Sequence, residues 1–363
     1  MDNTALSLKE SICAGAPALH SECLGLWPLQ ESGGKVGLLS SLTTYKKVVD
    51  IPNTYGLSEE DLDEVNDKLR QQNNFLEYSY ISNDQTGQVF SLKECVISSN
   101  HNPDRYHAEI QNRINTLERE AKEEGLTPVF LTMTLPSEFH EMKHHNGELV
   151  ANPRYNCTTP KEAVKILTKQ WAKLRQDRSL KELDKLQRMY YRVNEPHKDG
   201  TPHTHILLFI PKNRIDRVES AFKRLFNRSG NKFEKNIRSA ASYIMKYINK
   251  TLPLSKKEKL TETEHYLNAW FIKHRINRFC SSRSTAPIYL YRLVSHRYSL
   301  YALTQIRKGN TLQVFARMDN DKIMEIWDGD ELLFARSENI TLHTINEIQS
   351  NLQRYRTYKG KAA

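Results

Sequence analysis

Apolar positions follow a helical period in two segments of the central part of the chain. Ile110, Ile114 and Leu117 recur three to four positions apart, and Gly125 follows as a typical helix-ending residue. A second apolar stripe begins after a Thr-Thr-Pro sequence that suits a helix start, and comprises Val164, Leu167, Trp171 and Leu174. The pattern therefore predicts one helix from about residue 104 to 124 and another from residue 160 to about 174.

Three other segments show the pattern of strands. Residues 129–135 alternate between apolar and polar side chains up to a proline, and the runs 189–195 and 203–210 are also strand-like. Asp199-Gly200 lies between the last two runs, and Asp-Gly is a strong signal for a tight turn. The sequence thus predicts an antiparallel hairpin at 189–210.

Two further helices are expected after the hairpin, over residues 215–226 and 239–250. The order is then helix, strand, helix, hairpin, helix, helix. This order predicts an α+β fold, with an antiparallel sheet and helices on one side of it.

The flanking regions carry weaker patterns. A short helix is expected from Ser58, whereas Gly33-Gly34 and Ser40-Ser41 are typical of loops. Residues 311–336 predict short strands around Asp328-Gly329, and the tail 354–361 is expected to be disordered. We therefore predict three parts, which are an N-terminal region of unknown role (1–100), a central domain (101–255) and a basic C-terminal region (256–363).

The composition indicates a soluble protein of 363 residues, with 38% hydrophobic and 26% charged residues. The apolar run Ile206–Ile210 is far too short to span a membrane, and the N-terminal segment lacks the apolar stretch of a secretory signal. We expect a cytoplasmic protein without a membrane partner. No Cys-x-x-Cys pair is present, so a zinc ribbon is not predicted.

The positive charge is concentrated in one segment. Residues 212–259 contain fourteen Lys and Arg against four acids, an excess of +10 that equals the net charge of the whole chain. A solvated helical surface is the ordinary explanation for such a run. Its position beside the residues described next favours a phosphate-binding face. The expected DNA contacts are Lys223, Arg224, Arg228, Lys232, Lys235 and Arg238.

Two histidines and a glutamate of the predicted hairpin can form a metal site. His203 and His205 are two apart in a strand and project from the same face, while Glu195 on the partner strand can aim at the same point. Two imidazoles and one carboxylate leave open positions for a catalytic divalent ion. Ordinary cross-strand pairing is the alternative for His-x-His alone. His197, in the turn, is a possible substitute ligand.

A second group of reactive residues lies on the predicted helix 239–250. Tyr243, Lys246, Tyr247 and Lys250 share one face, opposite the apolar residues Ala241, Ile244, Met245 and Ile248. A tyrosine that attacks a phosphate needs a nearby cation or metal, because the pKa of a free phenol is about 10. The lysines can supply that charge. The alternative is a surface helix whose tyrosines stack on or cover neighbouring side chains.

These elements, in this order, resemble the HUH endonuclease superfamily, where U denotes a variable and usually hydrophobic residue. The resemblance is closest to the bacteriophage replication gene A protein family of rolling-circle initiators. It rests on four segments, namely Arg105–Arg113, Phe130–His140, Arg192–His205 with its Glu-Pro-His-Lys-Asp-Gly-Thr-Pro-His-Thr-His string, and Tyr243–Lys250. Thr204 occupies the U position, a mild departure that is expected to face away from the metal.

The resemblance implies a ferredoxin-like or RRM-like antiparallel sheet with the HUH hairpin at its centre. It further implies that His203, His205 and Glu195 bind Mg²⁺ or Mn²⁺ and that Tyr243 and Tyr247 are nucleophiles. The implied reaction is the nicking of single-stranded origin DNA, which leaves a 5′-phosphotyrosyl link and a 3′-hydroxyl primer, followed by rejoining of the displaced strand. A host helicase, a host polymerase and the bacterial cytoplasm are the implied partners and location.

Three other functions remain compatible with the sequence. A transposase or relaxase of the same superfamily would use the same residues. A DNA-binding module without catalytic activity, or a metal-dependent hydrolase without a covalent step, would use only part of them.

Overall fold

The computed structural model describes residues 53–145, 148–228, 230–252, 260–309, 314–320, 322–337 and 339–344. The loops predicted at Gly33-Gly34 and Ser40-Ser41, and the disordered tail predicted at 354–361, lie outside these residues.

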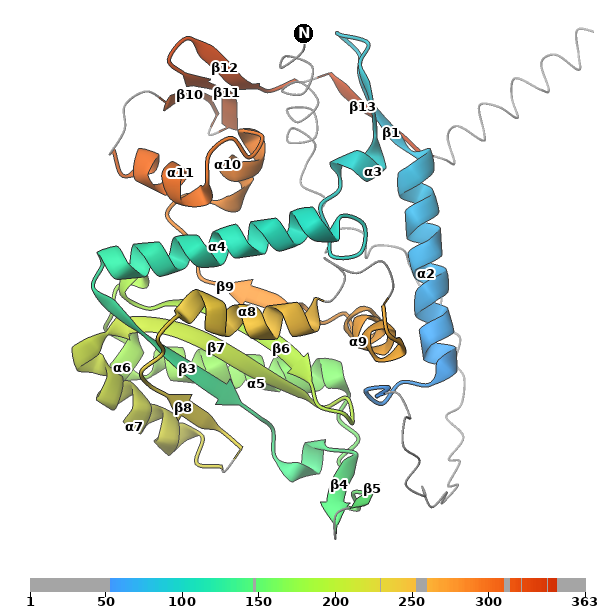
Figure 1. Ribbon diagram of the computed structural model, residues 1–363, viewed down its shortest axis with the longest axis vertical. Helices are drawn as coiled ribbons and strands as arrows, with labels where there is room; N and C mark the ends of the chain where they lie inside the picture. Colours follow the sequence, from blue (N-terminus) through green and yellow to red (C-terminus); the bar gives the residue numbers. More distant parts are fainter. Residues whose placement is uncertain are drawn as a thin grey trace, which may run out of the picture.

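The centre of the fold is a five-stranded antiparallel sheet in the order β8-β3-β7-β6-β9 (Figure 1). Its strands are β3 (Leu126–Met133), β6 (Met189–Pro196), β7 (Pro202–Pro211), β8 (Lys232–Glu234) and β9 (Phe279–Ser281). The predicted strand at 129–135 and the predicted hairpin are confirmed, since β6 pairs with β7 on either side of the Asp199-Gly200 turn. Strand β9 comes from the predicted C-terminal region but completes the same sheet.

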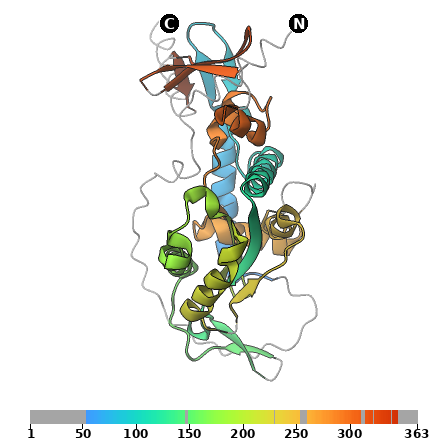
Figure 2. The same cartoon turned by 90° about the vertical axis from the view of Figure 1, so that its left-hand side faces the viewer.

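Helices cover both faces of this sheet, as the side view in Figure 2 shows. On one face, α5 (Pro160–Gln176), α6 (Arg178–Lys181) and α7 (Ile215–Leu225) pack against alternate residues such as Leu131 and Ile206. On the other face, α4 (Pro103–Glu123) and α8 (Ala240–Thr251) cover Phe130 and Leu207.

The α+β class is therefore confirmed, whereas the expectation of helices on one side only is wrong. Helices α5 and α7 do share a face, but α4 and α8 cover the opposite one. The unbroken apolar run Ile206–Ile210 explains the difference. A strand covered by helices on both faces is apolar at every position and does not alternate between apolar and polar residues.

The N-terminal helix α2 (Glu59–Tyr78) begins where it was predicted, after Ser58, but its 20 residues make it longer than the short helix expected there. The Ser58 side chain accepts a hydrogen bond from the backbone of Asp61, whose side chain accepts one from the backbone of Ser58. Helix α2 packs against α9 (Glu262–Lys273) through a separate apolar cluster that includes Tyr55 and Trp270. Residues far apart in the sequence thus meet beside the hairpin turn.

The remaining elements form smaller units. A second sheet, β13-β1-β2, joins β1 (Tyr80–Asn83) and β2 (Val89–Ser91) to β13 (Ile340–His343), with α3 (Leu92–Cys95) beside it. The strands predicted around Asp328-Gly329 are confirmed as β10 (Val314–Asp319), β11 (Lys322–Asp328) and β12 (Glu331–Ala335), which pack on α10 (Ile288–Leu293) and α11 (Leu300–Arg307). A two-stranded ribbon, β4 (Met142–His145) and β5 (Glu148–Ala151), follows β3. Within the described ranges, no helix combines the length and the apolar character needed to cross a bilayer.

Candidate active site

Three potential metal ligands meet on one face of the β6–β7 hairpin. Glu195 pairs directly with His203 in the strand register, and His205 lies two residues further along the same face. The Nε2 atoms of His203 and His205 lie 3.5 Å and 3.2 Å from Oε2 of Glu195. One donor atom from each residue lies within 4.8 Å of the others, so the set fits a single divalent cation. The structure thus brings the three predicted ligands together.

Thr204, between the two histidines, faces the opposite side of the sheet as expected. Its hydroxyl donates a hydrogen bond of 2.8 Å to Oδ1 of Asn194, and the Asn194 amide donates one of 2.7 Å to the carbonyl of Asn277. The polar residue at this position is therefore satisfied inside the protein and does not disturb the metal-binding face.

Two neighbours orient the ligands. The Thr132 hydroxyl lies 3.2 Å from Nδ1 of His205, which leaves Nε2 to face Glu195. Lys250 forms an ion pair with Oε1 of Glu195, while Oε2 faces the imidazoles. The alternation along residues 129–135 places Thr132 on the tyrosine side of the sheet, but the pattern alone gave no reason to assign it a role.

The surroundings of Glu195 and His205 favour the protonation states that bind metal. Burial by itself raises the pKa of Glu195, but hydrogen bonds with His203 and His205 and the contact with Lys250 hold that pKa well below its ordinary value. Burial lowers the pKa of His205, although Glu195 opposes this shift. A charged carboxylate and a neutral imidazole are the forms that coordinate a cation.

The two tyrosines of α8 lie beside the triad. The predicted apolar face of the helix is buried, and the tyrosine rings are partly buried against Phe130, with centroids 4.6 Å and 5.2 Å from it for Tyr243 and Tyr247. The ring of Tyr247 is also 4.0 Å from that of His205. Lys246, the other predicted lysine, is exposed on the same helix. Tyr247 is thus in direct contact with a predicted metal ligand.

Tyr243 has a different partner. Its hydroxyl donates a hydrogen bond of 2.7 Å to Oε2 of Glu234 on β8. Burial and this hydrogen bond both raise the pKa of the Tyr243 phenol. The pKa of Tyr247 is also raised by burial, but the neighbouring Tyr243 side chain opposes that rise. The two phenols therefore have unequal surroundings, although their sequence contexts are alike.

Helix α4 supports the tyrosine helix. The ring Nε2 of His107 lies 2.8 Å from Oδ1 of Asn249, and the backbone amide of Ala241 donates to Glu118 at 3.5 Å. The segments Arg105–Arg113 and Tyr243–Lys250, both part of the family resemblance, are thereby in contact. Helix α4 therefore helps to position the helix that carries the two tyrosines.

The hairpin turn is fixed by residues outside all four resembling segments. Gly200 adopts a φ of +83°, and a Cβ added there would lie 2.3 Å from the carbonyl oxygen of Tyr55. The indole Nε1 of Trp270 donates a hydrogen bond of 3.0 Å to the carbonyl of Gly200. Sequence periodicity could not find these contacts, because they join residues 70 or more positions apart.

We expect Gly200→Ala to destabilise the fold by about 2–5 kcal/mol. Roughly 1–2 kcal/mol arises from the left-handed backbone, and about 1–3 kcal/mol from moving Tyr55 aside. Gly87→Ala is the matched control, because Gly87 also has a positive φ (+68°) but nothing within 4 Å of the added Cβ. Denaturant unfolding of both variants measures the difference, and equal losses would contradict the close approach at Gly200.

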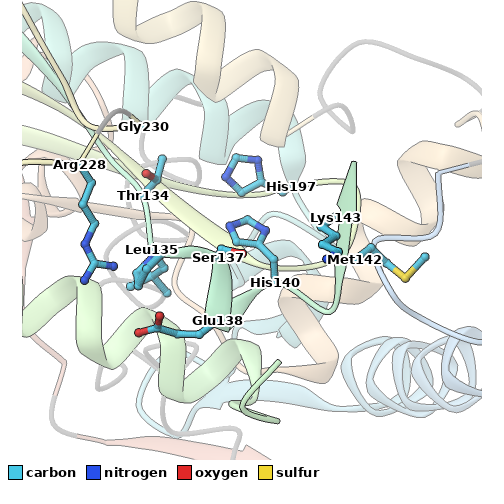
Figure 3. A pocket seen from close by; sticks show the side chains of 11 residues that line it. Thr134, Leu135, Ser137, Glu138, His140, Met142, Lys143, His197, Arg228 and Gly230 are labelled. Carbon is cyan, nitrogen blue, oxygen red and sulfur yellow. The ribbon is translucent and has the colours of Figure 1, made fainter. Parts of the chain in front are cut away.

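His197 lies between the triad and a neighbouring pocket. Its ring is 4.1 Å from that of His203, and burial, followed by the neighbouring His203, lowers the pKa of His197 to about 3. Its Nε2 is buried and has no hydrogen-bond partner. Figure 3 shows the pocket, with His197 and His140 side by side and Arg228 on the opposite side. His197 is thus near the triad, where a substitute ligand would be.

The six predicted DNA-binding cations do not form one surface. Lys223 and Arg224 lie on α7, across the sheet from the tyrosines, and form ion pairs with Glu219 at 2.8 Å and Asp177 at 2.5 Å. Lys235, which follows β8, forms an ion pair of 2.8 Å with Asp216 of α7.

The other three predicted cations lie nearer the site. Arg228 lines the pocket, Lys232 opposes Thr132 in the sheet register, and Arg238 precedes α8. All three side chains are exposed. Of the predicted set, these are the cations that the fold places on the approach to the triad.

The chain matches a known protein family over a range that contains these residues. Residues 44–254 match the model of the family described as "Bacteriophage replication gene A protein (GPA)". No solved structure matches the chain.

Three curated relatives carry replication names. The chain is 32% identical over 231 residues to the "Replication gene A protein" of Escherichia phage P2, which covers 56% of this chain and 30% of that protein. It is 31% identical over 238 residues to the "Probable replication protein P12" of Pseudoalteromonas phage PM2, covering 58% and 35%. It is 29% identical over 220 residues to the "Probable replication endonuclease from prophage-like region 1" of Salmonella typhi, covering 54% and 26%.

The chain therefore spans about a quarter to a third of the length of these relatives. The family match extends over more than half of the chain and includes the triad, the hairpin and the tyrosine helix. This chain belongs to the bacteriophage replication gene A protein family.

Proposed function

We propose that this chain initiates phage-type rolling-circle replication by nicking single-stranded origin DNA through a tyrosine and rejoining the displaced strand. The observation that carries the proposal is the contact between Tyr247 and His205, which places a phenol 4.0 Å, ring to ring, from a three-ligand metal site. The names of the relatives, which include a replication endonuclease, support a role in replication.

Each residue of the site has a separate role in this reaction. Glu195, His203 and His205 hold Mg²⁺ or Mn²⁺, which when bound polarises and positions the scissile phosphate. The phenol oxygen of Tyr247 forms a bond to phosphorus, and the bond from phosphorus to the upstream 3′ oxygen breaks. The phenol gives up its proton and the 3′ oxygen takes one up, so a 5′-phosphotyrosyl link and a 3′-hydroxyl result. Lys250 holds the Glu195 carboxylate, and Thr132 holds the His205 ring.

The second phenol serves the second cleavage. Tyr243 lies one helical turn from Tyr247, with ring centroids 6.0 Å apart, and can reach the same phosphate position after a side-chain rotation. Glu234 accepts its hydrogen bond and is placed to take its proton. Lys232 and Arg238 contact the phosphates of the bound strand.

One assay separates this function from its alternatives. The protein is incubated with single-stranded DNA of random sequence and Mn²⁺ or Mg²⁺, with or without EDTA, and then denatured. We expect DNA covalently attached to the protein only when the metal is present. Binding without cleavage would support a non-catalytic module, and cut DNA without attached protein would support a hydrolase. A transposase or relaxase would form the adduct but would not start polymerase-dependent synthesis from the 3′-hydroxyl on a plasmid with the cognate origin.

The role of Glu234 is tested by combining it with single tyrosine variants. In a Tyr247→Phe background, where only Tyr243 can react, we expect Glu234→Gln to slow adduct formation on the order of 10²-fold, because the phenol loses its proton acceptor. In a Tyr243→Phe background the same substitution should change the rate less than about twofold. Equal effects in the two backgrounds would contradict a specific link between Glu234 and Tyr243.

A further inference from the structure

A solvent-accessible pocket of about 630 Å³ lies beside the triad, and neither the ligands nor the tyrosines line it. It lies between the end of β3 with the segment that follows, the hairpin turn, and the connection from α7 to β8. Figure 3 shows the rings of His140 and His197 next to one another, Arg228 across from them, and the Thr134 hydroxyl between. Its volume is within the range of pockets that bind small organic molecules.

The pocket has a preformed wall. Nδ1 of His140 lies 2.9 Å from Oδ2 of Asp199, and Oδ1 of Asp199 accepts a hydrogen bond of 3.1 Å from the backbone of Thr201. The turn that carries Arg228 is joined to β3 by the side chain of Asn231, which accepts a hydrogen bond of 2.8 Å from the backbone of Thr134. His140 is therefore held by the turn between the two strands that carry the metal ligands, and the turn with Arg228 is held by the end of β3.

A continuous row of rings joins the pocket to the tyrosines through the triad. The ring centroids are 5.1 Å apart for His140 and His197, 4.1 Å for His197 and His203, and 4.8 Å for His203 and His205. The row ends with Tyr247, 4.0 Å from His205. The pocket and the nucleophile therefore lie at opposite ends of the row, with the predicted metal position between them.

We propose that this pocket binds the nucleotide immediately upstream of the cut, whose 3′ oxygen is the leaving group. The inference rests on the proposed function. In a displacement at phosphorus, the attacking and leaving oxygens lie roughly in line on opposite sides of the phosphorus. Since the phenol approaches from the α8 side, the leaving oxygen and its nucleoside must lie on the side of His197. The same pocket receives the 3′-hydroxyl end in the joining step, which is the reverse displacement.

The chemistry of the lining suits a nucleotide base with its sugar. Unstacked bases are bound on histidine rings and on the planes of arginine guanidinium groups. His140 and His197 offer the first and Arg228 the second, from opposite sides of the cavity. The hydroxyl of Thr134 is available to the polar edges of the base.

The test measures how the rate of adduct formation depends on the base upstream and on the base downstream of the cut. An oligonucleotide that forms the covalent adduct is selected from a random single-stranded library, and its cut is located by sequencing both fragments. The base is then removed either from the nucleotide just upstream of the cut or from the one just downstream. We expect loss of the upstream base to slow adduct formation by the wild-type protein on the order of tenfold, as for the loss of one stacked base.

Pocket variants should remove that sensitivity. In His140→Ala and in Arg228→Ala, loss of the upstream base should matter less than about twofold, while the effect of the downstream base stays as in the wild type. Arg228 is exposed, so its variant keeps the test valid if His140→Ala does not fold. Lys169→Ala, an exposed lysine of α5 on the opposite face of the sheet, is the charge-matched control and should behave like the wild type.

The outcomes separate the two proposals. If the wild-type protein forms no adduct with any library member, the proposed function is overturned and this inference with it. If the adduct forms but the pocket variants keep the full sensitivity to the upstream base, only the pocket assignment is overturned. Altered sensitivity to the downstream base instead would show that the strand runs in the opposite direction.

Discussion

The double variant Tyr243→Phe/Tyr247→Phe is expected to form no covalent DNA adduct at all. Phenylalanine keeps the ring packing on Phe130 and His205 but removes both hydroxyl groups, which are the only proposed nucleophiles. Denaturing gels with a labelled single-stranded oligonucleotide measure the adduct directly. Tyr289→Phe, which removes an exposed phenol on α10, is the control and should react normally.

The single variants should each retain some cleavage, but unequally. Tyr247 contacts His205, so its loss should reduce adduct formation more than the loss of Tyr243, whose hydroxyl is held by Glu234. Production of complete circles requires a second attack while the first link persists, and both single variants should therefore accumulate unresolved products. If either one produced circles like the wild type, the two-tyrosine scheme would be wrong.

Removal of a metal ligand should separate catalysis from binding. In Glu195→Ala and His205→Ala we expect cleavage to fall on the order of 10³-fold, because the cation that stabilises the phosphate is no longer held. Affinity for single-stranded DNA should stay within about threefold, since it comes mainly from basic side chains that contact phosphates. Cleavage rates and fluorescence-anisotropy titrations are measured on the same preparations.

A matched variant shows that the effect belongs to the triad. His145→Ala removes an exposed histidine from β4, outside the three-ligand cluster, and should leave both cleavage and binding unchanged. Cleavage by Glu195→Ala and His205→Ala at the wild-type rate would falsify the metal-site assignment.

The hairpin and the tyrosine helix were predictable because their signals are local. A period of two places His203 and His205 on one face, and a helical period separates Tyr243 and Tyr247 from the apolar residue Ile244. The Asp-Gly turn fixes the pairing that brings Glu195 opposite His203. These features need no information from distant parts of the chain.

The arrangement of layers was not predictable in the same way. An apolar helical face shows that a helix is buried, but not which side of the sheet it covers, and α4 and α8 cover the side opposite α5 and α7. The contacts of Glu234 with Tyr243, and of Trp270 with Gly200, depend on side chains brought together by the tertiary fold. The distribution of the basic segment was also not predictable from its charge. Some of its cations lie on α7, where they form ion pairs with acidic residues, and others lie on the side of the triad.

Mapping the covalent adduct by mass spectrometry is the most direct test of the account. The wild-type protein is reacted with a selected single-stranded oligonucleotide and divalent metal, digested with protease and nuclease, and searched for nucleotide-modified peptides. We expect a 5′-phosphate ester on Tyr247 or Tyr243 within the peptide of α8, and no modification when EDTA is present. Cleaved DNA without any modified tyrosine, or a modification on a residue outside α8, would contradict it.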